Sequence, residues 1–192
     1  MQARIVALLI GCTAWAGAAE VPLLLNNYAG APPEAIAFAR AVTARAFEGA
    51  EVKVAWEQPG EKERTVRPVT IHLLPDHMAR RMQDRPCAKT VAEAATIWVE
   101  WSCVERMAPS GHAKRVGQVL GYLIAHEVGH VLLADHRHDE GGLMRASWSA
   151  REQADLDRGE LRFADPARLR DSSLRWVRNA GVSVPVREGS AK

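Results

Sequence analysis

GHAKRVGQVLGYLIAHEVGHVLL, residues 111–133, is the longest stretch of the chain with a helical pattern, and it decides the fold. Its apolar residues fall on most faces, which predicts a buried central helix rather than a surface one. Small residues recur at every fourth position, at Gly117, Gly121, Ala125 and Gly129. Each glycine inside a helix costs about 1 kcal/mol relative to alanine. The stripe therefore predicts that a neighbouring element packs closely against this helix.

Shorter strands and helices flank the long helix on both sides. Strand patterns, rich in β-branched and aromatic residues, cover residues 21–28, 52–57, 69–74 and 96–101. Helical patterns cover residues 33–49, 149–158 and 166–170. This order of elements predicts an α+β fold, in which a small twisted mixed sheet packs on the long helix and a short helical part follows it.

The segments between these elements carry weaker patterns. Residues 59–68 are polar with a proline at each end, which predicts a surface loop. Residues 76–95 predict at most a short helix at 77–83 and a loop that carries Cys87. Residues 96–101 are either an edge strand beside the site, suited to binding an extended peptide, or plain core, which we favour. There are no internal repeats.

The first nineteen residues have the layout of a secretory signal peptide. Arg4 is followed by the apolar run IVALLIGCTAWA and then by small residues, so we expect cleavage after Ala19. The run is shorter than the roughly 20 apolar residues of a permanent membrane helix. An alternative is a lipobox, in which Cys12 is lipidated. We therefore expect an exported protein, periplasmic or extracellular, with a single domain over 20–175 and a polar tail over 176–192.

Export bears on the oxidation state of the two remaining cysteines. Without the signal, Cys87 and Cys103 form an even pair, which predicts a disulfide in an oxidising compartment. The alternatives are buried free thiols or a zinc-binding pair, for which no CxxC spacing is present. Of the 25 basic side chains only Arg4 leaves with the signal, against 23 acidic ones. This near-neutral balance predicts no nucleic-acid partner.

His126 and His130 are four residues apart within the long helix. Two imidazoles at this spacing share one helix face and can bind the same ion, and nitrogen ligands suit Zn²⁺. Glu127 lies about 100 degrees around the helix from His126. It can therefore act on a zinc-activated water as a general base without being a ligand. The spacing predicts a catalytic zinc centre.

The stretch HEVGHVLLADHRHDEGGLMRASW, residues 126–148, resembles the metzincin clan of zinc peptidases, in which HExxHxxGxxH is followed by a methionine turn. It is more similar still to a group of short exported bacterial proteins with HEIGHLLL and HSxxGIMRAxW motifs. The resemblance covers about 23 residues. It implies a zincin-like catalytic domain, a long active-site helix, and Met144 in a methionine turn that forms an apolar floor under the ligands without touching zinc.

The chain departs from the metzincin motif at Leu133, where the clan has glycine, so the turn back to the metal must be made differently. The third ligand is therefore open. Counting forward from His126 selects His136, and counting back from Met144 selects His138. We favour His138, because without a glycine at 133 the helix is expected to run about one residue longer and delay the return.

Other polar residues of this region have supporting or ordinary interpretations. Asp135 or Asp139 could itself bind the metal, but we favour a role in which one of them accepts a hydrogen bond from a metal-binding imidazole and orients its ring. Trp148 and Arg145 match the bacterial pattern and are expected to hold the returning loop. Tyr122 lies one turn before His126, where packing is the commoner role. We interpret the remaining histidines as ordinary, namely His72, His77 and His112.

These features together predict an exported zinc-dependent metallopeptidase, a hydrolase of peptide bonds with a peptide or protein substrate. Two alternatives remain open. One is a catalytically idle zincin scaffold that binds metal or another protein, against which the intact Glu127 argues. The other is a zinc hydrolase of a non-peptide amide. The sequence gives no cleavage preference and no oligomeric state.

Overall fold

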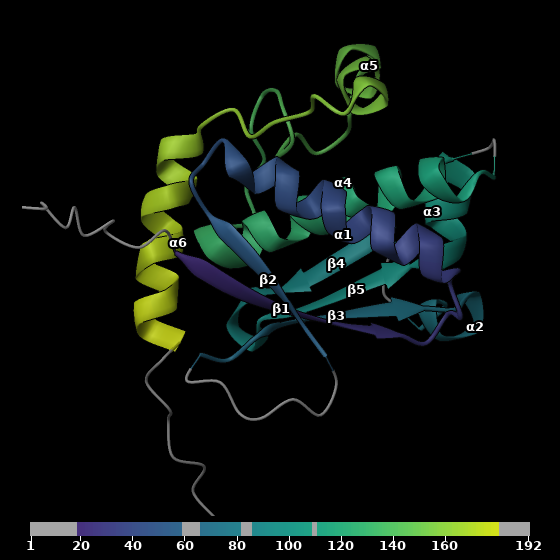
Figure 1. Ribbon diagram of the computed structural model, residues 1–192, viewed down its shortest axis with the longest axis horizontal. Helices are drawn as coiled ribbons and strands as arrows, with labels where there is room; N and C mark the ends of the chain where they lie inside the picture. The colour runs from purple at the N-terminus through teal and green to yellow at the C-terminus, as the bar shows by residue number, and fades with distance from the viewer. Residues whose placement is uncertain (1–18, 59–65, 82–85, 109–110, 181–192) are drawn as a thin grey trace, which may run out of the picture.

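The computed structural model describes residues 19–58, 66–81, 86–108 and 111–180 (Figure 1). Five strands form one sheet in the order β2-β1-β3-β5-β4. The strands are β1 Glu20–Asn27, β2 Lys53–Glu57, β3 Val69–Leu74, β4 Ala88–Val91 and β5 Thr96–Glu100. The helices are α1 Pro33–Glu48, α2 Asp76–Ala79, α3 Trp101–Met107, α4 Ala113–Leu133, α5 Ala150–Arg158 and α6 Pro166–Ala180, with a 3₁₀ turn at Ala92–Ala94. The fold is mixed α+β, as the order of elements predicted.

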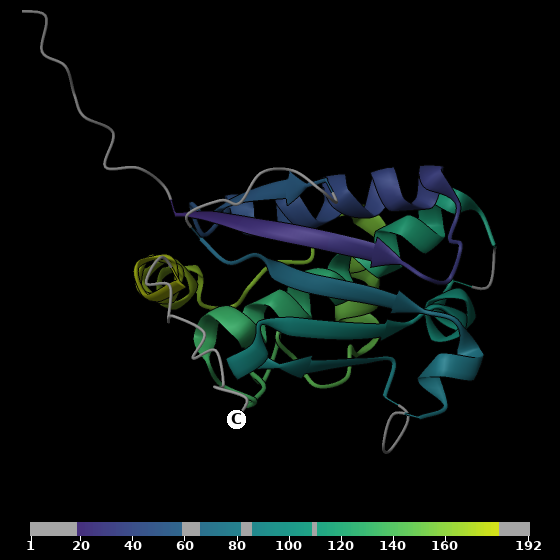
Figure 2. The same cartoon turned by 90° about the horizontal axis from the view of Figure 1, so that it is seen from below.

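The sheet is mixed because one edge strand runs against the others. β1, β2, β3 and β5 pair in parallel, whereas β4 pairs with β5 antiparallel. In Figure 2 the sheet faces the viewer, with α1 and α4 behind it. Alternate strand residues point at these helices and are fully buried, among them Leu23, Ile71 and Ile97. The sheet and the two helices thus form one continuous core.

The position of β5 settles the question about residues 96–101. β5 lies between β3 and β4, so it is an internal strand, and Ile97 and Val99 are fully buried. The core interpretation is confirmed and the edge-strand alternative is wrong. The edge beside α4 is β4, a strand that the weak pattern of residues 76–95 did not predict. A strand of four residues without clear alternation of polar and apolar side chains is too short to be recognised from the sequence.

The small-residue stripe of α4 is where α1 packs. A Cβ atom on Gly117 would lie 2.5 Å from the carbonyl oxygen of Ala35, and one on Gly121 would lie 2.7 Å from that of Ala39. The buried hydroxyl of Thr43 in α1 lies 2.9 Å from the Ala39 carbonyl oxygen of its own helix and 3.0 Å from the Gly121 carbonyl oxygen of α4. The predicted close approach is therefore confirmed.

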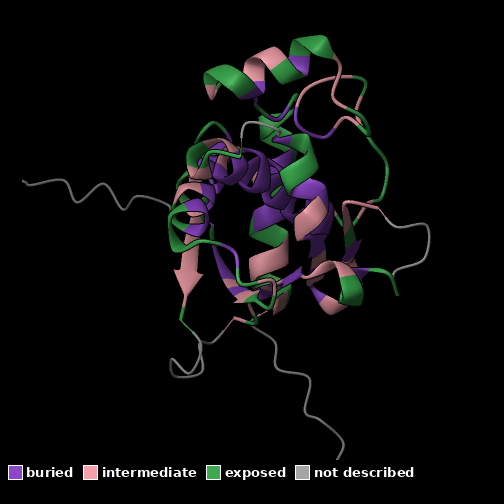
Figure 3. Ribbon diagram, turned by 90° about the vertical axis from the view of Figure 1, so that its right-hand side faces the viewer, coloured by how far each residue is buried: buried purple, intermediate pink, exposed green. Residues whose placement is uncertain are grey.

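α4 is the central helix of the fold. Its residues from Val116 to Leu132 are almost all buried, as its colour in Figure 3 shows, while α5 is largely exposed. α4 is long and apolar enough to cross a membrane by length and composition, but 89% of its most apolar window is buried inside the protein. The pattern is that of a core helix.

Three helical segments differ from the expectation. α3 follows β5 directly, where the sequence predicted only the end of a strand at residue 101. α6 continues to Ala180, ten residues beyond the predicted end at 170 and into the segment expected to be a tail. The helix packs against α4 and β1. The predicted short helix at 77–83 is realised as α2, which ends at Ala79.

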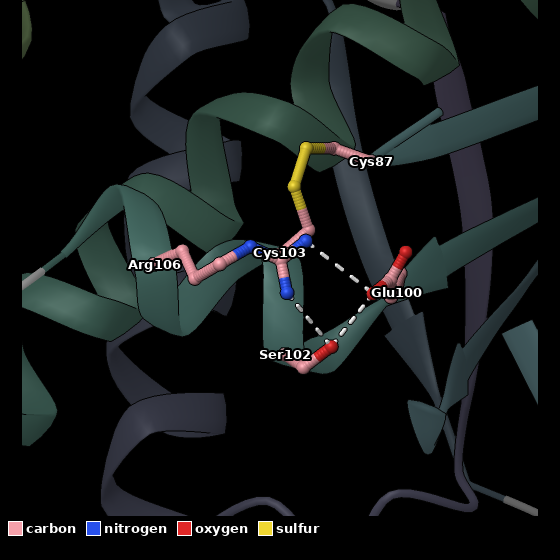
Figure 4. The surroundings of a disulfide bond; sticks show 5 residues. All are labelled: Cys87, Glu100, Ser102, Cys103 and Arg106. Carbon is pink, nitrogen blue, oxygen red and sulfur yellow. Dashed lines mark hydrogen bonds and ion pairs between the residues drawn. A yellow bond between two sulfur atoms is a disulfide. The ribbon is translucent and has the colours of Figure 1, made fainter. Parts of the chain in front are cut away.

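Cys87 and Cys103 are joined as a disulfide, with Cα atoms 5.4 Å apart (Figure 4). The bond links the residue before β4 to α3, and Glu100 N–H donates to the Cys87 carbonyl at 2.8 Å. The pair agrees with the prediction and suits an oxidising, exported environment. The lipobox cysteine Cys12 and all of the expected signal peptide except its last residue, Ala19, fall in residues 1–18, and most of the expected loop at 59–68 falls in 59–65. Both lie outside the described residues.

Candidate metal centre

His126 and His130 occupy the C-terminal half of α4, and both side chains are buried. Their Nε2 atoms lie 3.1 Å apart. Two nitrogens that share a tetrahedral zinc at 2.0–2.1 Å are expected about 3.3 Å apart. The pair therefore fits one ion of this size with little movement.

The other ring nitrogen of each histidine is held by a backbone carbonyl. His126 Nδ1 lies 2.7 Å from the Leu143 oxygen, and His130 Nδ1 lies 2.7 Å from the Asp135 oxygen. A carbonyl only accepts, so each Nδ1 carries the proton and each Nε2 is left with its lone pair. Both rings are thus oriented for metal binding through Nε2.

This arrangement corrects the expectation that an aspartate carboxylate orients an imidazole. The Asp135 carboxylate instead bonds Arg137 at 2.8 Å and Arg168 at 3.1 Å. The hydrogen bonds from Arg137 lower the pKa of Asp135 below its usual range. The Asp139 carboxylate lies 3.8 Å from Arg168. These ion pairs tie the loop after α4 to α6, and the backbone does the orienting.

His138 completes a three-histidine cluster with His126 and His130. The ligand atoms of the three lie within 4.8 Å of one another, and the His138 ring centroid is 5.3 Å and 4.9 Å from the other two. His138 is exposed, so its ring can turn inward without disturbing the core. His136 is not part of the cluster, and its ring lies 6.2 Å from that of His130.

The chain returns to His138 through a turn that replaces the glycine of the metzincin motif. α4 ends at Leu133, and Ala134 takes the left-handed conformation with φ of 49°. A residue with a Cβ pays about 1 kcal/mol or more for that conformation. The turn therefore comes one residue later than the motif's glycine, as the sequence argument for His138 expected.

Met144 is fully buried under the histidine-bearing helix. A Cβ on Gly129 would lie 2.6 Å from the Met144 sulfur, so glycine at this position admits the methionine. The loop is held by further bonds: Asp139 N–H donates to the Met144 carbonyl at 3.0 Å, and Trp148 Nε1 donates to the Leu143 carbonyl at 3.2 Å. Trp148 thus supports the returning loop, as expected.

Burial acts on the titrating groups of the site. It lowers the pKa of His126 to about 4, so this ring is neutral and able to bind a metal at pH 7. Burial also raises the pKa of Glu127, against a hydrogen bond from Thr90 and the nearby His130 and His136 that lower it. Glu127 is thus a buried carboxyl of raised pKa, with His130 and His136 nearby.

A cleft of about 570 Å³ opens in front of these groups. His126, Glu127 and His138 line it, together with Ala88 of β4 and Trp148 of the loop. Much of the remaining lining is apolar, for example Met107, Val119, Leu123 and Leu156. The cleft therefore places the histidine cluster in contact with solvent and beside the edge strand of the sheet.

Several polar residues weighed from the sequence lie elsewhere. Tyr122 is fully buried and faces Arg162 and the Leu161 backbone, so it is a packing residue. His72 lies on the sheet face opposite the helices, stacked between Tyr28 and Trp98 at 5.7 Å and 6.4 Å between ring centroids. Neither contributes to the cluster.

The sequence reasoning missed Thr90 and the two backbone carbonyls. Thr90 lies on β4, and its hydroxyl is 2.5 Å from Glu127 Oε2. No residue pattern points to a carbonyl acceptor, and β4 itself was not predicted.

No protein-family model matches the chain, and the searches found no similar curated protein and no similar solved structure. The resemblance to metzincins rests on the motif of residues 126–148 and on the three-histidine cluster.

Proposed function

We propose that this chain is an exported, zinc-dependent metallopeptidase of the metzincin type. The observation that carries the proposal is the convergence of His126, His130 and His138 beside the buried carboxylate of Glu127, at the wall of an open cleft. Three nitrogen ligands with a fourth position left for solvent are the donor set of a catalytic zinc, whereas structural zinc sites are closed by four protein ligands.

Zinc is the metal that the donor set favours. All three donors are imidazoles, which suit a borderline-soft ion, and the 3.1 Å between two Nε2 atoms suits tetrahedral coordination. A zinc ion bound there would lower the pKa of a water ligand toward about 7 and polarise a substrate carbonyl. His126, His130 and His138 are the residues that would hold it.

Glu127 is the proposed general base. Its carboxylate accepts a proton from the attacking water and delivers that proton to the nitrogen of the departing amine, so no covalent intermediate with the protein forms. A raised pKa suits this exchange, because the group must both accept and release a proton near neutral pH.

The edge strand supports a peptide as the substrate. β4 pairs with β5 on one side, and within the described residues no strand pairs with its other side. Ala88 of β4 lines the same cleft as Glu127. An extended peptide can add to such an edge through backbone hydrogen bonds and lie across the histidine cluster.

The test uses mature protein that begins at Glu20. Elemental analysis is expected to find about one zinc per chain, and a library of internally quenched peptides is expected to be cleaved. Glu127→Gln should keep the zinc and lose at least about a hundredfold in rate, the contribution of a general base. If zinc-loaded wild type cleaves peptides no faster than Glu127→Gln, the result would favour a catalytically idle scaffold. Cleavage of non-peptide amides alone would favour a zinc hydrolase of such amides.

A further inference from the structure

The hydroxyl of Thr90 is the closest partner of the Glu127 carboxylate. Thr90 Oγ1 lies 2.5 Å from Glu127 Oε2 and 3.3 Å from the Glu127 carbonyl oxygen. A hydroxyl has one proton to donate, and the charged carboxylate at the shorter distance is the stronger acceptor. Both side chains are buried, with 9% of Thr90 and 7% of Glu127 exposed.

We propose that Thr90 is a positioning residue for Glu127. Its hydroxyl holds Oε2, so the carboxylate is kept in one orientation and Oε1 is presented for proton transfer. The inference rests on the proposed function, because it assigns Thr90 a part in that same reaction. Thr90 does not touch the reacting atoms and acts through Glu127.

A strand position does not by itself need this hydroxyl. Valine has the same shape as threonine, favours strands at least as well and is cheaper to bury. Thr90 forms its ladder pairing with Ile97 of β5 through the backbone, which any residue can do. The hydroxyl adds a bond to a side chain 37 residues away on another element. Its use is therefore to hold Glu127 rather than to form the sheet.

The disulfide also fixes the start of the strand that carries Thr90. Cys87, three residues earlier, is covalently joined to Cys103 of α3, and its carbonyl accepts from Glu100 N–H at 2.8 Å. A glutamate side chain loses rotamer entropy when it is confined, and an anchored hydroxyl can enforce that confinement before substrate binds. The disulfide thus helps to fix the strand, and the Thr90 hydroxyl on that strand fixes the Glu127 carboxylate.

The experiment compares Thr90→Val and Thr90→Ala, which lose the hydroxyl, with Thr90→Ser, which keeps it. Thr96→Val is the matched control, because among the described residues the Thr96 hydroxyl donates to the Ala94 carbonyl, two residues away. The readouts are zinc per chain, kcat and KM on a cleaved peptide, and crystal structures of the zinc-loaded proteins that show the Glu127 carboxylate.

We expect Thr90→Val and Thr90→Ala to keep one zinc and an unchanged KM while kcat falls about tenfold or more, a part of the 10²–10⁴ that general-base catalysis contributes. Thr90→Ser should recover kcat to within about threefold, and Thr96→Val should match wild type. In the crystals, Glu127 should occupy one rotamer in wild type and Thr90→Ser and several in Thr90→Val.

A kcat within twofold of wild type in Thr90→Val, or a Thr90→Ser no better than Thr90→Val, would overturn the proposal. So would a single unchanged Glu127 rotamer in Thr90→Val. The crystal readout separates this result from a failure of the proposed function. If zinc-loaded wild type hydrolyses no amide, the metallopeptidase proposal fails, and the Glu127 rotamers still decide whether Thr90 positions it.

Discussion

The Nδ1 atom of His126 lies 2.7 Å from the carbonyl oxygen of Leu143, seventeen residues further along the chain. The same carbonyl accepts from Trp148 Nε1 at 3.2 Å. One backbone oxygen therefore orients a candidate metal ligand and anchors the loop that carries Met144. Substitutions that shift this loop are therefore expected to change the orientation of the His126 ring through that oxygen.

The identity of the third ligand can be tested by two substitutions two residues apart. We expect His138→Ala to weaken zinc binding by on the order of a hundredfold or more, since each ligand contributes on the order of 3 kcal/mol. His136→Ala is the matched control and should bind zinc like wild type, because His136 lies outside the cluster. The measurement is a zinc titration by competition with a chromophoric chelator; a loss in His136→Ala alone would reverse the assignment.

Glu152 should make the stability of the loop depend on pH. Hydrogen bonds from Ser149, and a further one from Gly142 N–H, lower the pKa of Glu152 from 4.5 to about 2. A carboxyl with a lowered pKa in the folded state stabilises the protein above its unfolded pKa, and this contribution is lost as the pH falls through the folded pKa.

We therefore expect Glu152→Gln to melt below wild type at pH 7, and the gap to close between about pH 4.5 and about pH 2, the window set by these two pKa values. Thermal melts at a series of pH values measure it. Glu93→Gln is the control, because Glu93 is exposed and lies far from the loop in the sequence. Its melting temperature should follow that of wild type at each pH. A gap that is constant with pH would contradict the assignment.

The contact between α1 and α4 should not tolerate a methyl group. In Gly121→Ala the new Cβ would lie 2.7 Å from the Ala39 carbonyl oxygen and from the Val42 Cβ. Overpacking of this kind costs about 1–3 kcal/mol or more, whereas alanine returns about 1 kcal/mol of helix propensity. We expect a net loss of up to about 2 kcal/mol in urea unfolding.

Gly49→Ala is the control for this steric argument. Gly49 caps α1 with φ of −64°, and a Cβ there would meet nothing within 4 Å. Alanine at such a position is expected to be neutral or to stabilise by about 0.4–1 kcal/mol through the unfolded chain. Equal effects of the two substitutions would show that the contact is looser than the structure has it.

Removing the disulfide should destabilise the fold. Cys87 and Cys103 are 16 residues apart in sequence, and a loop of about that length gives a chain-entropy contribution of about 3 kcal/mol. We expect the double substitution Cys87→Ala with Cys103→Ala to lose about that amount in denaturant unfolding. A reducing agent should lower the stability of wild type and leave the double variant unchanged, which separates the disulfide from the loss of two side chains.

The sequence by itself determined the features that depend on local spacing. α4 follows from a long apolar run, and the pairing of His126 with His130 follows from their i, i+4 separation on one helix face. Four of the strands, β1, β2, β3 and β5, follow from short runs rich in apolar, β-branched and aromatic residues. The glycine stripe predicted a close contact with another element, because close packing is what can offset the lower helix propensity of glycine. In each case the information lies within a few neighbouring residues.

The tertiary structure decided which distant residues meet. Whether His136 or His138 returns to the cluster depends on the left-handed turn at Ala134 and the path of the loop after it. The bond from Thr90 to Glu127 depends on β4 being the edge strand, which four residues of sequence do not reveal. The carbonyls that orient the histidines carry no residue signature, because every residue has one. Such contacts arise only when the whole chain packs.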